Sequence, residues 1–113
     1  MATTLKFGLA TGAHATVVGV GVIQAGAAAI TEQTNALTSE TGQTGFILPA
    51  SWPAGSPIWC RVGTVAATIY PPVGGKINGA ATNAVFSATA AKTVLLMPLD
   101  DGTGLNWFAV LSA

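Results

Sequence analysis

The chain has 113 residues, of which four are acidic and four basic, so that charged residues make up 7% of it and the formal net charge is zero. A soluble domain carries charge at roughly a quarter of its positions, and proteins that bind nucleic acid cluster their Lys and Arg residues, whereas the basic residues here are scattered singly. The composition therefore argues against a nucleic-acid partner and favours a subunit whose uncharged surface is covered by other protein.

This length predicts one domain with the unfavourable surface-to-volume ratio of a small fold, for which oligomerisation is a usual remedy. The single cysteine, Cys60, excludes an internal disulfide framework. Residues Met1–Gly12 lack the alternation of a strand and look unable to hold a place in a sheet alone. We therefore predict an N-terminal arm over residues 1–16 that reaches a neighbour, followed by a single β-domain over residues 17–113.

The stretch from Phe7 to Thr31 has no charged residue, which raises the alternative of a signal peptide or a membrane segment. Lys6, the apolar run Val17–Ile23 and the small residues Ala27–Ala29 are compatible with that alternative. The run is nevertheless rich in Gly and Ala, and it is no poorer in charge than the rest of the chain. We therefore expect no membrane partner.

Fourteen Gly, six Pro and frequent Thr and Val, without a long apolar stripe at helical spacing, predict an all-β domain of short strands. We expect a small antiparallel β-barrel or β-sandwich. The one tract that could be helical is Gln24–Asn35. A strand or irregular structure is equally open there, because the tract contains Thr residues and has no clear cap.

The middle of the chain is divided by turn residues. Gly45–Pro49 is a short apolar run closed by proline, and the loop Ser51–Pro57 that follows is dense in residues that break regular structure. Ile58–Val62 then reads as a strand, and Gly63-Thr64 can turn it back into a second strand, Val65–Tyr70. This pair predicts a β-hairpin.

The last third contains the strongest strand candidates. After the short extended pieces Lys76–Gly79 and Ala84–Thr89, the runs Lys92–Leu99 and Leu105–Leu111 are joined by a turn segment, Asp100–Gly104. The terminal run places apolar side chains on both of its faces. This pattern indicates that one face meets the core and the other meets a neighbouring subunit.

The residues that could carry catalysis are few and isolated. His14 is the only histidine and has no acid near it in the sequence, and Cys60 lies on a predicted strand, where a buried thiol is the simplest interpretation. One His and one Cys cannot supply the usual ligands of a zinc site. We therefore expect no catalytic residue, no metal and no cofactor, and we do not expect an enzyme.

Two further patterns have simple structural interpretations. The adjacent acids Asp100 and Asp101 lack the alternating ligands and the terminal Glu of a calcium loop, so we interpret them as part of a hairpin turn. Gly19, Gly21 and Gly26 miss the spacing of a dinucleotide-binding loop. These glycines are expected to serve packing or bulges.

The aromatic residues could stack on sugars or fill a core, and for those on predicted strands the core is the favoured interpretation. Trp52 differs because it stands in a loop flanked by proline, where capping the core and anchoring an interface are both open. We place four apolar residues in the core or in a seam between copies, namely Phe86, Val94, Trp107 and Phe108.

From Gln24 onward the pattern resembles a small β-domain found in structural proteins of tailed phages. The resemblance covers about four-fifths of the chain, and its most specific part is a Tyr-Pro pair followed by Gly-x-x-Ile-Asn-Gly and a late Trp. The matching segments are Gln24–Ala27, Gly45–Pro49, Ile58–Val62, Thr68–Pro72, Gly74–Gly79, Asn83-Ala84, Ala91–Val94 and Asn106–Val110. One departure is Trp59-Cys60-Arg61, where the family more often has aliphatic and Asn residues.

Members of this group are capsid decoration, or cement, proteins. The resemblance implies a homotrimer that is assembled in the host cytoplasm and stabilises an icosahedral capsid by binding the outer surface of the major capsid protein. The residues expected to contact the capsid are Thr3, Leu5, Phe7, His14 and Trp52. Similar modules occur in phage fibres, so a receptor- or glycan-binding tip is the alternative, and a small secreted lectin-like domain is a third.

Overall fold

The computed structural model describes residues 14–113, and in this part of the chain it contains ten β-strands and no helix. The all-β prediction is therefore confirmed. The strands are β1 (His14–Val18), β2 (Ala28–Ala29), β3 (Thr34–Thr38), β4 (Gly45–Ile47), β5 (Ile58–Val62), β6 (Ala67–Tyr70), β7 (Lys76–Ile77), β8 (Phe86–Ala88), β9 (Thr93–Pro98) and β10 (Asn106–Leu111).

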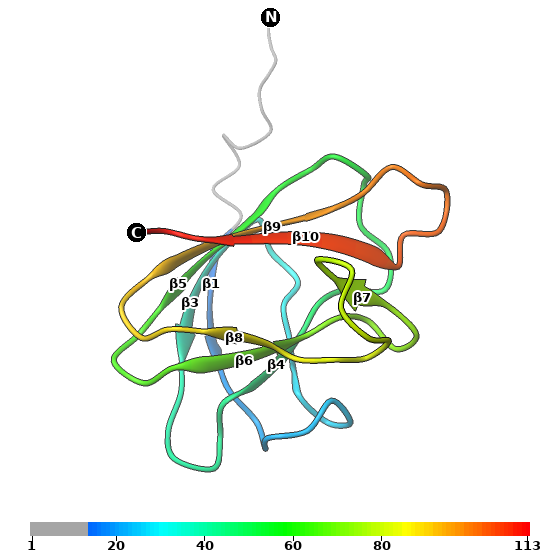
Figure 1. The fold of residues 1–113 in the computed structure, drawn as a ribbon. Helices are drawn as coiled ribbons and strands as arrows, with labels where there is room; N and C mark the ends of the chain where they lie inside the picture. The colour runs from blue at the N-terminus through cyan, green and yellow to red at the C-terminus, as the bar shows by residue number, and fades with distance from the viewer. Residues whose placement is uncertain (1–13) are drawn as a thin grey trace, which may run out of the picture.

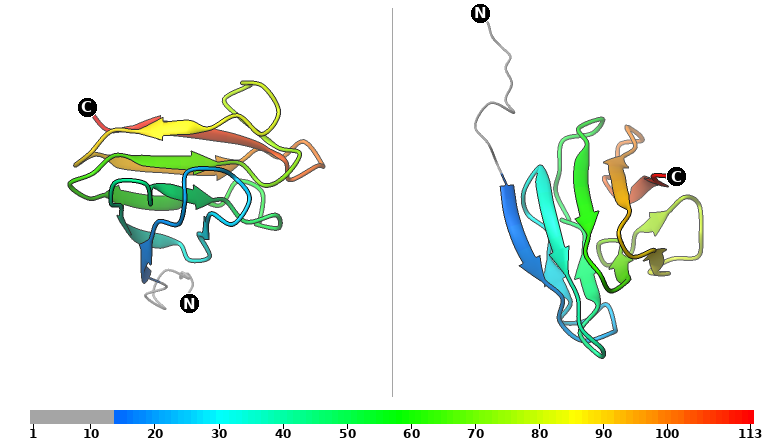
Figure 2. Two further views of the ribbon diagram at one scale, coloured as in Figure 1. Left: turned by 90° about the horizontal axis from the view of Figure 1, so that it is seen from below. Right: turned by 90° about the vertical axis from the view of Figure 1, so that its left-hand side faces the viewer.

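The strands form two sheets that lie over one another (Figures 1 and 2). The larger sheet has six strands in the order β1-β3-β5-β9-β10-β7, and the smaller has four in the order β2-β4-β6-β8. Apolar side chains from both sheets are buried in one common core, of which Trp107, Phe46 and Leu96 are among the largest fully buried members. Each sheet therefore has one face that packs in the core and one outer face.

The chain alternates between the two sheets over its first six strands, because β1, β3 and β5 belong to the larger sheet and β2, β4 and β6 to the smaller. Sheet neighbours among these six strands are thus joined by crossovers through the other sheet instead of tight turns, and such crossovers permit parallel pairing. Five of the eight pairings among the described strands are parallel. The expectation of an antiparallel domain is therefore wrong, since both sheets are mixed.

The hairpin predicted around Gly63-Thr64 is also wrong. β5 has neighbours on both of its edges, β3 and β9. At its end Val62 N donates to Lys92 O, and Gly63 N, one residue further on, donates to Leu37 O. No edge of β5 is left for the next strand. The turn instead carries the chain to the smaller sheet, where β6 pairs with β4 and β8.

The C-terminal pair agrees with the sequence. β9 and β10 are antiparallel neighbours joined by the segment Asp100–Gly104, as predicted. The short strand β7 lies beside β10, and the side chain of Asn78 extends this pairing, because its Nδ2 donates to Ala109 O and its Oδ1 accepts from Ala109 N, both at 2.9 Å. Asn78 and Gly79 have φ of 55° and 72°, which is the conformation that an Asn-Gly turn requires.

The remaining elements follow the sequence in outline. The short runs expected at Gly45–Pro49, Lys76–Gly79 and Ala84–Thr89 contain β4, β7 and β8. The tract Gln24–Asn35 contains β2, irregular structure and the start of β3. Of the alternatives open from the sequence, the helix is therefore excluded for this tract. Residues 14–16, assigned to the arm from the sequence, are the first residues of β1, and the rest of the predicted arm lies outside the described residues.

Candidate interaction surface

The outer face of the six-stranded sheet carries a continuous row of apolar side chains across three neighbouring strands. In the sheet register Trp59 on β5 lies opposite Leu95 on β9, which lies opposite Val110 on β10, and Met97 lies opposite Phe108. Alternation along each strand sends the intervening residues, such as Cys60, Leu96 and Trp107, into the core. We call these five residues, Trp59, Leu95, Met97, Phe108 and Val110, the apolar strip.

The apolar strip is open to solvent in the isolated chain. Trp59, Phe108 and Val110 are 46%, 41% and 44% exposed, and Leu95 and Met97 are half-buried between them. Exposed apolar side chains that stand singly are ordinary on protein surfaces, whereas a contiguous group marks an interaction site. The pairings across β5, β9 and β10 make the strip such a group.

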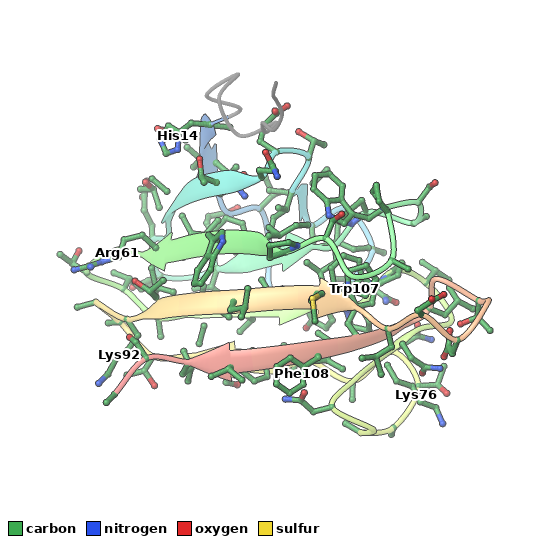
Figure 3. All side chains as sticks on the ribbon, turned by 90° about the horizontal axis from the view of Figure 1, so that it is seen from above. His14, Arg61, Lys76, Lys92, Trp107 and Phe108 are labelled. Atoms are coloured by element: carbon green, nitrogen blue, oxygen red, sulfur yellow. The ribbon has the colours of Figure 1, made fainter. Side chains whose placement is uncertain are left out.

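Charge is absent from the strip and lies beyond its ends. On the outer face, Arg61 stands two residues after Trp59 on β5, and Lys76 lies on β7 at the edge of the sheet. Figure 3 shows Arg61 and Lys92 toward one end of the strands and Lys76 toward the other, with Phe108 between them. All four acids of the chain lie outside the strands. The strip is therefore an uncharged surface with basic residues at its ends.

Trp59 was not predicted at this surface, because the sequence assigns the strand aromatics to the core. The core assignment is wrong for Trp59, which faces outward, and Phe108, placed in the core or in a seam between copies, also faces outward. The missed signal is the alternation around Trp59, since Ile58, Cys60 and Val62 share one face of β5 and are all buried. A tryptophan between two buried positions on a strand must lie on the opposite face.

The four residues placed in the core or in a seam between copies have different positions. Val94 and Trp107 are fully buried in the core, and Phe86 is half-buried and packs against it from β8. Phe108 lies in the strip. Of these four residues, only Phe108 is therefore available to a partner.

The residues expected to contact a capsid are only partly described. His14 is exposed at the start of β1, the edge strand of the larger sheet, with its Nδ1 3.0 Å from Thr34 Oγ1. Trp52 is half-buried, packs against the core and donates from Nε1 to Ser56 O at 3.2 Å, so it caps the core. Thr3, Leu5 and Phe7 lie outside the described residues.

A second group of exposed apolar side chains lies at the end of β1 and on the connection to β2. Val18, Val20, Val22 and Ile23 are between 48% and 61% exposed. The connection is tied to the smaller sheet because the Tyr70 hydroxyl donates to Val22 O at 2.7 Å. We call residues 18–23 the apolar loop, and in Figure 1 it lies at the bottom of the molecule, away from β9 and β10.

The groups that could support chemistry are not brought together. Cys60 is buried in the core, and this burial raises the pKa of its thiol to about 12, although a hydrogen bond from Asn35 acts in the opposite direction. Within residues 14–113 no three His, Cys, Asp or Glu residues gather where they could hold a metal ion. The same part of the chain has no helix that is long and apolar enough to cross a membrane.

The loop between β9 and β10 is organised by Asp101. Its Oδ1 accepts from Thr103 N at 3.0 Å and from Thr103 Oγ1 at 2.7 Å, and its Oδ2 accepts from Asn106 Nδ2. The bond from Asn106, followed by those from Thr103, lowers the pKa of the Asp101 carboxyl to about 2. Asp101 therefore serves the hairpin turn predicted from the sequence.

The pH dependence of stability is expected to reveal this role. Because the folded state lowers the pKa of Asp101 below its ordinary value of 3.8, the carboxylate stabilises the fold above about pH 4, and this contribution is lost as the pH falls toward 2. Thermal unfolding from pH 6 to pH 2 should therefore show a smaller acid-induced fall in Tm for Asp101→Asn than for the wild type. Asp100→Asn is the control and should behave as the wild type, because Asp100 makes none of these bonds.

Comparison with known proteins identified no relative of this chain. No protein-family model matches the chain, and neither a curated protein nor a solved structure matches it. The apolar strip is therefore the feature of this chain that points most directly to a function.

Proposed function

We propose that this chain is a structural protein of a tailed-phage virion, which binds as a homotrimer to the outer surface of the assembled capsid and stabilises it. The observation that carries the proposal is the apolar strip, an exposed and uncharged surface on a small chain with a net charge of zero. Soluble monomers rarely leave contiguous apolar surface of this kind uncovered. The resemblance of the sequence to capsid decoration proteins is the reason for proposing this class of virion protein.

The proposed mechanism is thermodynamic linkage. A protein that binds the assembled shell and not its free subunits shifts the equilibrium toward the shell. A trimer carries three copies of each contact on one rigid body, so modest individual contacts add up through a high effective concentration. No copy then needs a large interface with the capsid.

Two segments are the proposed contacts with the major capsid protein. They are the N-terminal arm with Thr3, Leu5 and Phe7, which leads to His14 at the start of β1, and the loop around Trp52. The indole of Trp52 packs against the core, and this packing holds the loop in place. A loop fixed in this way loses little further conformational freedom when it binds a partner.

The proposal predicts a trimer in solution and a loss of capsid stability without the protein. Purified protein should sediment with the mass of three chains. Particles assembled without it should release their contents at a lower temperature than complete particles, and added protein should restore their resistance. A monomer at all concentrations, or particles whose heat resistance does not depend on the protein, would contradict the proposal. A low copy number per particle would indicate a fibre tip instead.

A further inference from the structure

We infer that the apolar strip is the surface through which copies of this chain meet one another. This inference rests on the proposed trimer and deepens it, because it names the residues that form the seam between subunits. The occupant of the strip is thus a second copy of this chain, and the capsid is bound by other parts of the surface. The kinds of side chain in the strip, the distribution of charge and the uncharged surface beside the strip support the assignment.

The side chains of the strip are those that the centre of a protein–protein interface selects. Such centres are enriched in aromatic residues, Met and Arg, and depleted in Lys, Glu and Asp. The strip contains Trp59, Phe108 and Met97, and it has no Lys, Glu or Asp. Because these residues project from three hydrogen-bonded strands, their positions are already set before a partner arrives, which lowers the entropy cost of association.

The distribution of charge favours an identical partner. Copies related by a symmetry axis bring residues near the axis close to the same residues of a neighbour. A charged residue there would face its own like charge, which is unfavourable. All five members of the strip are uncharged, whereas the basic residues Arg61 and Lys76 lie beyond its ends. The zero net charge of the chain also removes long-range repulsion between copies.

A stable contact between subunits extends beyond the five residues of the strip. A standard interface takes about 800 Å² from each partner, which is about one seventh of the 5551 Å² that this chain exposes. The outer residues of β3, namely Thr34, Ala36 and Thr38, continue the face beside the strip, so they can form the rim of the same contact.

Lysine substitutions within and outside the strip test the inference. Phe108→Lys and Val110→Lys place a charge where copies would meet, and the concentration for half-association should rise about 30-fold or more. Val73→Lys is the matched control, because Val73 is 73% exposed and lies in a loop outside the strip. Sedimentation over a range of concentrations gives the mass of each variant, and circular dichroism with cooperative thermal unfolding shows that it is folded.

A measurement on the unmodified protein avoids any effect of substitution on folding. Hydroxyl-radical footprinting should find Trp59 and Met97 protected in the wild-type trimer, although Trp59 is 46% exposed in the single chain. Val22 and Ile23 of the apolar loop provide an internal comparison, because the seam does not include them. Strong oxidation of Trp59 and Met97 in a stable trimer would overturn the inference.

The outcomes separate this inference from the proposed function. A trimeric wild type with monomeric Phe108→Lys and Val110→Lys variants supports both. Variants that remain trimeric overturn the assignment of the strip and leave the trimer intact, and if they also fail to bind capsids, the strip faces the capsid instead. A wild type that is monomeric at every concentration contradicts the proposed assembly itself.

Discussion

Replacing Trp107 by alanine is expected to lower the free energy of unfolding by about 3–5 kcal/mol. Trp107 is 1% exposed and is among the largest fully buried side chains of the described residues. On β10 it lies opposite Pro98 of β9 and Ile77 of β7, so its removal opens a cavity where three strands meet. The surrounding backbone is held by sheet hydrogen bonds and can collapse only partly into such a cavity.

Trp107→Phe is the matched control. Within the described residues Trp107 Nε1 is buried and has no hydrogen-bond partner, so phenylalanine removes an unpaired donor while it keeps most of the packing. The loss should therefore be much smaller than for alanine. Chemical unfolding at one fixed protein concentration measures both variants, because dissociation of an oligomer makes stability depend on concentration. Equal losses for the two variants would contradict this account.

Gly75→Ala is expected to destabilise the fold by about 3 kcal/mol, at the upper end of the usual range for overpacking. A Cβ atom at Gly75 would lie 2.6 Å from Leu105 O and 2.9 Å from Pro72 O. Both are backbone atoms and cannot turn aside as a flexible side chain can. The same region carries the hydrogen bonds that dock β7 onto β10, including Lys76 N to Leu105 O at 2.9 Å.

Gly63→Ala tests whether the cost comes from these close contacts. A Cβ atom at Gly63 would meet only Leu37 O, at 3.1 Å, so a shift of a few tenths of an ångström relieves it. Its effect should be well below that of Gly75→Ala in the same chemical unfolding experiment. If Gly75→Ala were as stable as Gly63→Ala, the close packing of β7 against β10 would be disproved.

The candidate interaction surface could be predicted in part. The alternation in β10 indicates that both faces of the terminal strand are apolar, and the structure buries Trp107 and Ala109 on one face and exposes Phe108 and Val110 on the other. Leu95 and Met97 could not be assigned in the same way, because the run Val94–Met97 is apolar at every position. An alternating pattern distinguishes two faces only where their side chains differ in polarity.

By itself the sequence determined the all-β class, the positions of most strands, the turn around Asp101 and the scarcity of charge. These properties depend on residues that are close in the chain, such as proline, glycine and the alternation of apolar side chains. Only the tertiary structure decided which strands are neighbours. β5 and β6 are adjacent in sequence yet lie in different sheets, because β3 and β9 already pair with both edges of β5. That pairing sets Trp59 beside Leu95 and so creates the strip from segments that are distant in the chain.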